Sequence, residues 1–484
     1  MRVTVTDTSP DASEANLVCA GLFEGEELAE PFSSAAGAGD AKPAYKKTAL
    51  LHTDGGGHAL AAGLGKREEF QPERARVAAA LAVHEARRIQ VSTLAWVLPE
   101  GGEAEAIATA LVEGTLLGSY RFDRFRSRDS DDDEPKGEIE SLEILAGEAA
   151  DGLSEAVETA RIASEGANRA RELQNLPSNV ATPTFLADRA REIAHAHESV
   201  IVEVLGREDF DRLGMGGLAA VSKGTDEDPC LIVLRYDGGG GGAPLGLVGK
   251  AVTFDTGGIS IKPSARMQEM KMDMSGGAAV LEATAAIAEL GLGLDVLALI
   301  PSTENMPSGH ATKPGDIITQ LGGKTVEVNN TDAEGRLILA DALGYAVELG
   351  AERIVDLATL TGAVLVALGS TYAALISNDD EWAESVRAAG DETGELAWRL
   401  PLHPEYKELT KGSVADLTNA SEKRKAGTIY AGSFLEEFVG GRPWAHLDIA
   451  GTAWDVGREY VGKGATGFGV RLLVALARDL AQAG

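Results

Sequence analysis

The sequence is poor in aromatic residues and in cysteine. Aromatic residues make up only 5% of its 484 residues although 44% are hydrophobic, so the core must be built mainly from alanine, valine and leucine. This composition excludes a disordered chain, and the length is sufficient for two or three domains with substantial cores. The two cysteines, Cys19 and Cys230, each lie in an apolar run. They predict buried thiols rather than a disulfide framework or a thiolate metal site.

Positive charge is also scarce, with 44 basic residues against 75 acidic ones and a formal net charge of -31. A field of this sign repels nucleic acids and anionic membrane surfaces, so neither is expected as a partner. It suits the solvated acidic surface of a halophilic protein, because salt screens the self-repulsion. The first residues lack a basic stretch followed by an apolar core, and no apolar run reaches the roughly 18 residues of a membrane-spanning helix. A cytoplasmic location is therefore expected.

Alternating strand-like and helix-like runs predict two α/β domains joined by a helix. We expect an N-terminal α/β domain over residues 1–152, a connecting helix over 153–175 and a second domain over 176–484. The N-terminal alternation favours a partly parallel sheet. Its expected strands are 15–23, 48–52, 91–98 and 139–145, and its expected helices are 72–88 and 103–116.

The second domain has a more regular pattern, which predicts a central, mostly parallel sheet with helices on both faces. The expected strands are 200–204, 231–236, 245–249, 294–299, 324–328, 353–357 and 444–449. The expected helices are 187–195, 277–290, 337–349 and 466–481, and Thr182 with Pro183 is typical of a capped helix start. In such sheets ligands bind beyond the carboxyl ends of the strands, and polar residues follow several of these strands.

Two glycine-rich stretches and one charged stretch are interpreted as connections. Residues 55–57 are more typical of a turn than of a phosphate cradle, and residues 238–242 lack the lysine, serine or helix start of a phosphate loop. Residues 128–138 predict a solvated charged loop. The N-terminal domain thus shows no catalytic constellation, which favours a structural or assembly role over nucleotide binding.

The segment 330–336 (NTDAEGR) lies between a strand-like run and an apolar helix-like run. In an extended backbone Asp332, Glu334 and Arg336 project to one side, where two carboxylates can bind a metal ion and the arginine an anion. The segment also fits a helix capping box, because Glu334 follows Thr331 by three residues. Taken alone it favours the capping box, and a metal site requires further carboxylates from elsewhere.

Those carboxylates are available after another strand and before a helix. Asp255 follows the strand 245–249 in KAVTFDTGG, and Asp273 lies in MKMDMSGG ahead of an expected helix, where alone it would be interpreted as an N-cap. With Asp332 and Glu334 they make four carboxylates, which repel strongly in a site of lowered dielectric and which two divalent cations would neutralise. Oxygen ligands without a paired histidine motif favour Mn²⁺, Mg²⁺ or Zn²⁺.

Four segments resemble the cytosolic leucyl aminopeptidase family, and the NTDAEGRL stretch is highly specific to it. The segments are VGKAVTFDTGGISIKP from Val248, MKMDMSGGAAV from Met270, NTDAEGRLILADAL from Asn330 and DLATLTGA from Asp356. The similarity is near-continuous from about residue 170 to the C-terminus, and the first 150 residues match only in general character. Thr256 and Ser275 stand where serine and glycine are common, and neither position is a ligand. The resemblance implies a macro-domain-like N-terminal domain and a homohexamer.

The resemblance also implies a ligand set for two metal ions. Both ions share Asp255 and Glu334. Asp332 completes one site, and Lys250 with Asp273 completes a second, more exchangeable site. A lysine can bind a metal only as the neutral amine, so the cations and desolvation must lower its pKa. The expected ions are Mn²⁺ or Zn²⁺, with Co²⁺ or Mg²⁺ as alternatives in the exchangeable site.

The implied activity is removal of N-terminal amino acids, preferentially leucine and other apolar residues, from peptides with a free N-terminus. A hydroxide that bridges the two metals attacks the peptide bond. Lys262 stabilises the charge that develops on the scissile carbonyl oxygen, and Arg336 holds a bicarbonate that serves as general base. The residues implied in substrate binding are Met270, Asp273, Thr359, Leu360, Gly362 and Ala450.

Two other functions stay open at this point. A different two-metal hydrolase, such as a phosphoesterase, also uses carboxylate pairs, and Lys262 and Arg336 could hold phosphate. Some members of the family bind DNA as regulators, but the net charge of -31 and the lack of a basic stripe oppose that role here.

Overall fold

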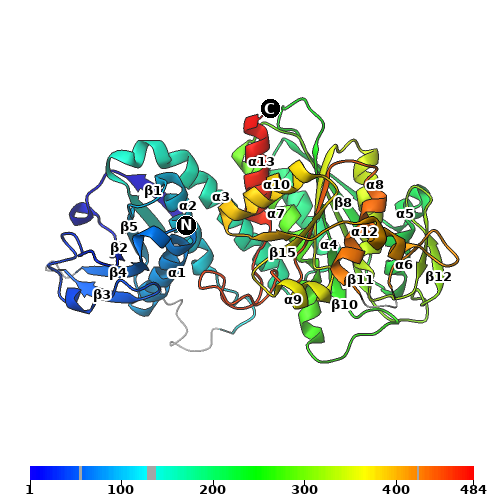
Figure 1. Cartoon of the computed structure of the whole chain (residues 1–484), viewed down its shortest axis with the longest axis horizontal. Coiled ribbons are helices and arrows are strands. Elements are labelled where there is room, and N and C mark those ends of the chain that lie inside the picture. The colour runs from blue at the N-terminus through cyan, green and yellow to red at the C-terminus, as the bar shows by residue number, and fades with distance from the viewer. Residues whose placement is uncertain (54–56, 128–137, 422–424, 484) are drawn as a thin grey trace. The chain divides into compact units, whose positions relative to one another are not determined.

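The computed structural model describes residues 1–53, 57–127, 138–421 and 425–483 (Figure 1). The chain divides into two units, one comprising Met1–Asn168 with Gly457–Gly462 and the other Arg169–Val456 with Lys463–Gly484. Gly55, Gly56 and most of the charged stretch 128–138 lie outside the described residues. No helix in the described part of the chain is both long and apolar enough to cross a membrane.

The N-terminal unit contains a sheet with the strand order β1-β6-β5-β2-β4-β3, in which the only antiparallel neighbours among the described residues are β3 and β4. Its strands are β1 (Arg2–Thr6), β2 (Leu17–Phe23), β3 (Thr48–His52), β4 (His58–Gly65), β5 (Thr93–Val97) and β6 (Ser141–Leu145). Helices α1 (Pro72–Arg88) and α2 (Ala104–Ser119) share a core with the sheet. They also pack closely against each other, since a Cβ at Gly114 of α2 would lie 2.0 Å from the carbonyl oxygen of Arg76 in α1. The predicted partly parallel sheet is confirmed.

Both cysteines are free and buried, as predicted. Cys19 lies in the core of the N-terminal sheet, and Cys230 begins strand β8 (Cys230–Tyr236) of the other unit. The helix start at Thr182 is confirmed too. Helix α4 (Pro183–Ala196) follows α3 (Ala150–Asn175), and the Thr182 hydroxyl accepts the backbone N–H of Phe185 at 3.2 Å.

The large unit is built on a sheet with the order β16-β15-β18-β14-β9-β11-β8-β7, with β10 beside β11. Its further strands are β7 (Val200–Leu205), β9 (Leu245–Gly249), β10 (Ala251–Asp255), β11 (Val296–Asn305), β14 (Arg353–Ala358), β15 (Ala373–Ser377), β16 (Ala397–Arg399) and β18 (Trp444–Asp448). The central neighbours β18, β14, β9 and β11 are parallel, as predicted, whereas β7, β8 and β15 add antiparallel pairs towards the edges. A small second sheet contains β12 (Asp316–Thr319), β13 (Thr325–Val328) and β17 (Leu417–Thr418).

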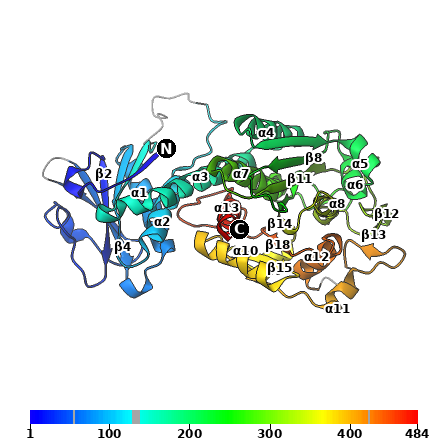
Figure 2. The same cartoon turned by 90° about the horizontal axis from the view of Figure 1, so that it is seen from above.

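Helices cover both faces of this sheet (Figure 2). Helices α7 (Ser275–Leu290), α10 (Asp380–Thr393) and α13 (Val470–Ala483) lie on one face, and α8 (Gly335–Glu348) and α12 (Gly427–Leu435) lie on the other. Shorter helices are α5 (Arg207–Leu213), α6 (Gly216–Val221), α9 (Gly362–Leu368) and α11 (Pro404–Lys407). The predicted helix start at Thr466 is wrong, because Gly467 and Gly469 have positive φ angles and interrupt the helical backbone before Val470.

The carboxyl ends of β10, β14 and β18 meet at one edge of the large sheet. Lys250 separates β9 from β10, and both strands pair with the long strand β11. The backbone at Lys250 is fixed on two sides, since its N–H donates to Leu357 and its carbonyl accepts the N–H of Gly277. One continuous stretch of chain therefore places Lys250 and then Asp255 at the edge where ligands bind in such sheets.

Asp341, a fully buried residue of helix α8, binds the backbone of two other segments. Its Oδ2 accepts the backbone N–H of Leu218 at 2.9 Å, and its Oδ1 accepts that of Leu321 at 2.9 Å. Burial raises the pKa of Asp341 to about 7, while these backbone donors act in the opposite direction.

We predict that Asp341→Ala lowers the free energy of unfolding by about 2 to 4 kcal/mol, because two buried N–H groups lose their acceptor. Urea denaturation followed by circular dichroism measures the change. Glu348→Ala, at an exposed position on the same helix, is the control and should shift stability by less than about 0.5 kcal/mol. Equal effects of the two substitutions would contradict a supporting role for Asp341.

Candidate metal centre

The segment 330–334 forms a turn before α8 and is not extended. Helix α8 begins at Gly335, Glu334 occupies the N-cap position without a capping side-chain bond, and Arg336 lies in the first helical turn. The Thr331 hydroxyl accepts the N–H of Ser260 at 2.8 Å and donates to the carbonyl of Gly257 at 2.7 Å. The capping-box interpretation is therefore wrong, because the loop that follows β10 uses the Thr331 hydroxyl.

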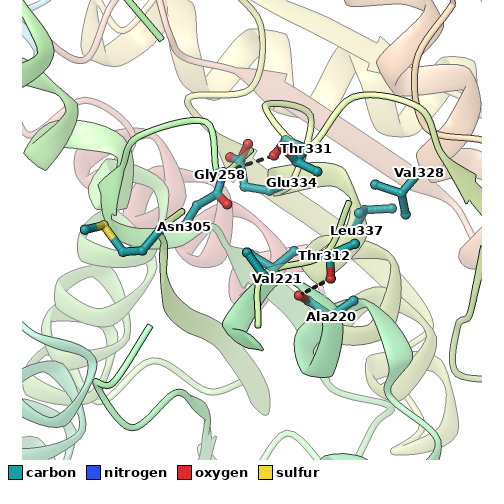
Figure 3. Close-up of a pocket in the computed structure, with 11 residues that line it drawn as sticks. Ala220, Val221, Gly258, Asn305, Thr312, Val328, Thr331, Glu334 and Leu337 are labelled. Atoms are coloured by element: carbon teal, nitrogen blue, oxygen red, sulfur yellow. Dashed lines mark hydrogen bonds between the residues drawn. The ribbon is translucent and has the colours of Figure 1, made fainter. Parts of the chain in front are cut away.

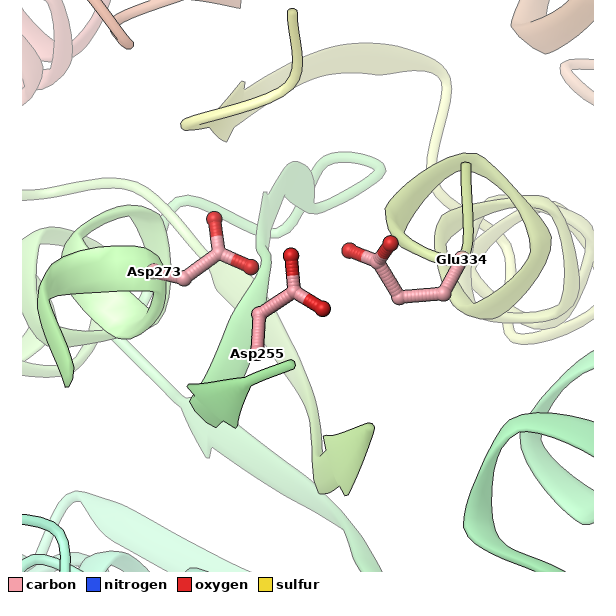
Figure 4. Close-up of side chains that lie close together, drawn as sticks. All are labelled: Asp255, Asp273 and Glu334. Carbon is pink, nitrogen blue, oxygen red and sulfur yellow. The ribbon is translucent and has the colours of Figure 1, made fainter. Parts of the chain in front are cut away.

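Three carboxylates, those of Asp255, Asp273 and Glu334, point into one space (Figure 4). Their ligand atoms lie within 4.8 Å of one another, and all three residues are buried. Asp255 ends β10, Glu334 precedes α8, and Asp273 lies in a 3-10 helix over Met267–Met274. The N-cap interpretation of Asp273 is wrong, since α7 begins two residues later and the carboxylate accepts bonds from Lys250 and Thr359 instead.

Lys250 and Lys262 each lie between two carboxylates. Lys250 Nζ is 2.8 Å from Asp273 Oδ2 and 2.8 Å from Glu334 Oε1. Lys262 Nζ is 2.7 Å from Asp255 Oδ2 and 2.6 Å from the fourth carboxylate, Asp332 Oδ1. The Lys250 side chain passes so close to Gly335 that a Cβ there would lie 2.7 Å from Nζ. All the residues that the sequence assigns to metal ligation thus belong to one cluster.

Burial and mutual repulsion shape the electrostatics of this cluster. Burial, together with the negative charge of Glu334, raises the pKa of Asp255, and burial likewise raises the pKa of Asp273. Burial opposes the ammonium form of Lys250, but the surrounding carboxylates outweigh it and raise the pKa of this lysine. The cluster therefore stabilises any positive charge that enters it.

The carboxylates in the cluster outnumber the lysines, four to two. Asp273 Oδ2 and Asp332 Oδ1 contact lysines without hydrogen-bond geometry, and Glu334 Oε2 has no hydrogen-bond partner among the described residues. Unpaired buried carboxylate oxygens are costly unless a cation binds them. The carboxylates present fit divalent cations that accept oxygen ligands. The pKa of Lys250 is raised here, not lowered as metal binding requires, so a cation would have to displace its proton before the amine could join them.

Arg336 is buried beside the cluster and is only partly paired. Its Nη1 donates to the carbonyl of Asn419 at 2.7 Å, and its guanidinium lies 5.5 Å from the ring centre of Tyr430. Its Nε has no hydrogen-bond partner, and its guanidinium no carboxylate ion pair, within the described ranges. Burial lowers the pKa of Arg336. A buried guanidinium with a free donor is suited to holding a small anion.

Two asparagines support the site, and no role was predicted for either. Asn305 Nδ2 donates to Asp255 Oδ1 at 2.8 Å and to the carbonyl of Thr331 at 3.0 Å. Asn419 Oδ1 accepts the N–H of Asn329 at 2.9 Å, and its carbonyl binds Arg336. Both lie in segments similar to the family (ENMPSG and LTNASEKRKAG), but their bonds join chain segments 26 or more residues apart. Because the bonded residues are so far apart in sequence, no local sequence pattern could have predicted a role for either asparagine.

The expected substrate-binding residues lie around the same edge of the sheet. Thr359 is in direct contact with the cluster, since its carbonyl accepts from Lys250 Nζ at 3.0 Å and its hydroxyl donates to Asp273 Oδ1 at 2.7 Å. Met270 and Leu360 are half-buried, as is Ala450, and the exposed Gly362 begins α9. Met270, Leu360, Gly362 and Ala450 are thus partly accessible beside the cluster, whereas Thr359 is buried.

A separate cavity of about 20 Å³ is lined by Glu334, Thr331, Asn305 and apolar residues of α6 and α8 (Figure 3). This volume is sufficient for about one water molecule and too small for a leucine side chain. The cavity is therefore not the pocket for a substrate side chain.

Sequence comparisons identify the family of the chain. The family model "Cytosol aminopeptidase family, catalytic domain" matches residues 168–474, and the model of the N-terminal domain of the same family matches residues 12–129. A "Probable cytosol aminopeptidase" of Roseiflexus castenholzii is 46% identical over 492 residues, covering 100% of both chains. One of Alkaliphilus metalliredigens is 47% identical, covering 90% of this chain and 88% of the relative.

Solved structures give the same result. "Bottromycin maturation enzyme BotP" matches with a TM-score of 0.87 at 36% identity, covering 97% of this chain and 100% of that chain. The structure of BotP in complex with Mn also has a TM-score of 0.87 and covers 96% of this chain. With the carboxylate cluster, these matches show that the chain belongs to the cytosol aminopeptidase family and is a metal-dependent aminopeptidase.

Proposed function

We propose that this aminopeptidase removes leucine and other apolar residues from the free N-terminus of peptides and requires two divalent ions, Mn²⁺ or Zn²⁺. The convergence of Asp255, Asp273 and Glu334 within 4.8 Å is the observation that carries the proposal. Asp255 and Glu334 would be shared by both ions. Asp332 would complete one site, and Lys250 with Asp273 the other. When bound, the ions supply Lewis acidity that lowers the pKa of a water molecule and polarises the scissile carbonyl.

The protein's own residues would orient the substrate and balance charge. The carboxylate of Asp273 is suited to binding the substrate's α-ammonium or amino group, which restricts cleavage to the first residue. The carboxylates around Lys262 outweigh burial and raise its pKa, which favours its ammonium form. It can therefore stabilise the negative charge that develops on the carbonyl oxygen. In this proposal the side chain of the first residue contacts Met270, Thr359 and Leu360, together with Gly362 and Ala450.

Arg336 would hold bicarbonate, which supplies a general base for the attacking water. Its unpaired, buried Nε supports this assignment. The position of Arg336 in the first turn of α8 supports it as well, since the helix dipole favours an anion there.

The resemblance to the family further favours a cytoplasmic homohexamer with a macro-domain-like N-terminal domain. The exchangeable site would accept Co²⁺ or Mg²⁺ in place of Mn²⁺ or Zn²⁺. These properties concern assembly and metal choice and are independent of the assignment of the ligands.

We predict that Glu334→Gln lowers the rate of leucine anilide hydrolysis by about 100-fold or more, because it removes charge from a ligand shared by both ions. EDTA should inactivate the wild type to the same extent, with recovery on addition of Mn²⁺. Manganese per chain, measured after gel filtration, should fall in the variant. Glu348→Gln, which removes an exposed charge from α8, is the matched control, and a phosphoester serves as negative substrate. Full activity in both Glu334→Gln and EDTA-treated wild type would refute the mechanism.

Arg336→Met should lower kcat by about 100-fold, since it removes the residue that holds the general base. The informative readout is bicarbonate dependence. Adding bicarbonate to a carbonate-depleted wild type should raise its rate, and the variant should not respond. A variant that keeps the bicarbonate response would exclude Arg336 as the binding residue, even if its overall rate were low.

We also propose that salt stabilises the protein, as expected of a halophilic chain with a net charge of -31. Raising KCl from 0.1 to 2 M shortens the screening length from about 10 Å to less than about 3 Å and weakens self-repulsion between carboxylates. We expect the midpoint of thermal unfolding to rise by at least about 5 °C over this range. Unfolding that is independent of salt, or promoted by it, would contradict the proposal.

A further inference from the structure

Asp448, the last residue of β18, is a fully buried carboxylate outside the metal cluster. Its Oδ1 accepts the backbone N–H of Leu360 at 3.1 Å and that of Ala450 at 3.2 Å. Its Oδ2 accepts the hydroxyl of Thr361 at 2.6 Å, and the N–H of Thr361 lies 3.4 Å from Oδ1. It makes no ion pair with lysine or arginine among the residues that the structure describes. Its bonds go instead to backbone and hydroxyl groups of two loops.

Those two loops follow neighbouring parallel strands. Ala358 at the end of β14 is the register partner of Asp448 at the end of β18. Beyond this pair the two strands end, and the chain continues through Leu360 and Thr361 after β14 and through Ala450 after β18. Because one carboxylate binds N–H groups from both chains, it fixes the distance between the two loops at the point where they separate.

A third segment is linked to the same carboxylate indirectly, through Thr361. The Thr361 hydroxyl that binds Asp448 also lies 2.8 Å from the hydroxyl of Thr428 in α12. The residue before Leu360 is Thr359, whose carbonyl and hydroxyl bind Lys250 and Asp273. The loop after β14 is thus held at one end by the metal cluster and at the other end by Asp448.

We propose that Asp448 is a positioning residue that fixes the width of the pocket for the substrate's first side chain and thereby sets the preference for leucine over smaller residues. The inference rests on the proposed function, since Leu360 and Ala450 are pocket residues only if that function is correct. Asp448 touches neither the metal ligands nor, in this proposal, the substrate. Its effect passes through the backbone of the two loops that it joins.

The test compares kcat/KM for the anilides of leucine and alanine. The ratio between the two substrates should fall by about fivefold or more in Asp448→Ala, because loops that can shift no longer select for side-chain size. Asp448→Asn keeps an acceptor oxygen at the same place and should retain most of the ratio. The manganese content and affinity of Asp448→Ala should stay within about twofold of the wild type, since the metal ligands are unchanged.

Asp341→Ala is the matched control. Asp341 is also fully buried and also accepts backbone N–H groups, those of Leu218 and Leu321. Neither of these residues is assigned to the pocket. The control variant should lose stability without changing the leucine-to-alanine ratio. Thr361→Val provides a second variant if Asp448→Ala does not fold. It should lower the ratio, and Thr361→Ser, which keeps the hydroxyl, should restore it.

The outcomes separate this inference from the proposed function. A wild type that hydrolyses neither anilide contradicts the proposed function. A wild type that prefers leucine, together with unchanged ratios in Asp448→Ala and Thr361→Val, overturns the inference alone. Equal loss of activity on both substrates, accompanied by loss of manganese, would also overturn it, because Asp448 would then act through the metal site.

Discussion

Repulsion among four carboxylates is the interaction around which the catalytic unit is arranged. Asp255, Asp273, Asp332 and Glu334 come from three separate segments. Burial raises the pKa of Asp255, Asp273 and Asp332, so these three carboxylates are less stable here than in water. Two lysines offset about half of the charge. The remaining negative charge suits the cluster to divalent cations. The same repulsion that makes the cluster costly by itself is thus what a bound cation would relieve.

The fold makes this arrangement possible by placing strand ends and helix starts at one edge of a rigid sheet. The break at Lys250 lets two consecutive strands pair with the same neighbour, β11, and brings a lysine and an aspartate to the edge within six residues. A side chain at position 335 would displace Lys250, because a Cβ there would lie 2.7 Å from its Nζ. The backbone thus holds the cluster residues in place, which would lower the cost of ordering them around a cation.

The sequence was sufficient to predict the α/β class, the parallel centre of the sheet and the grouping of the metal-cluster residues. The class and the sheet follow from hydrophobic periodicity, whereas the grouping of Lys250, Asp255 and Asp273 with the NTDAEGR segment follows from the resemblance of several segments to the family. It was insufficient where bonds join distant segments. Thr331 looked like a helix cap because the competing partners, Gly257 and Ser260, lie 71 or more positions away. Strand β4 was missed because its run of alanine and glycine has low strand propensity and is held in place by its neighbours.

The same limitation applies to residues that act through the backbone. Asn305, Asn419 and Asp448 bind main-chain groups far away in sequence, so a local pattern gives them no distinct signature. Their positions nevertheless separate two tasks. Asn305 and Asn419 brace the segment that carries Asp332, Glu334 and Arg336, whereas Asp448 braces the loops beyond the ligands. Thr359 connects the two regions, because it is bound to Lys250 and Asp273 and precedes the residues bound to Asp448. If the loop after β14 contacts the first side chain of the substrate, as proposed, the part beyond Thr359 can change that selection while Thr359 stays bound to the cluster. Chemistry and specificity can therefore diverge independently on this scaffold.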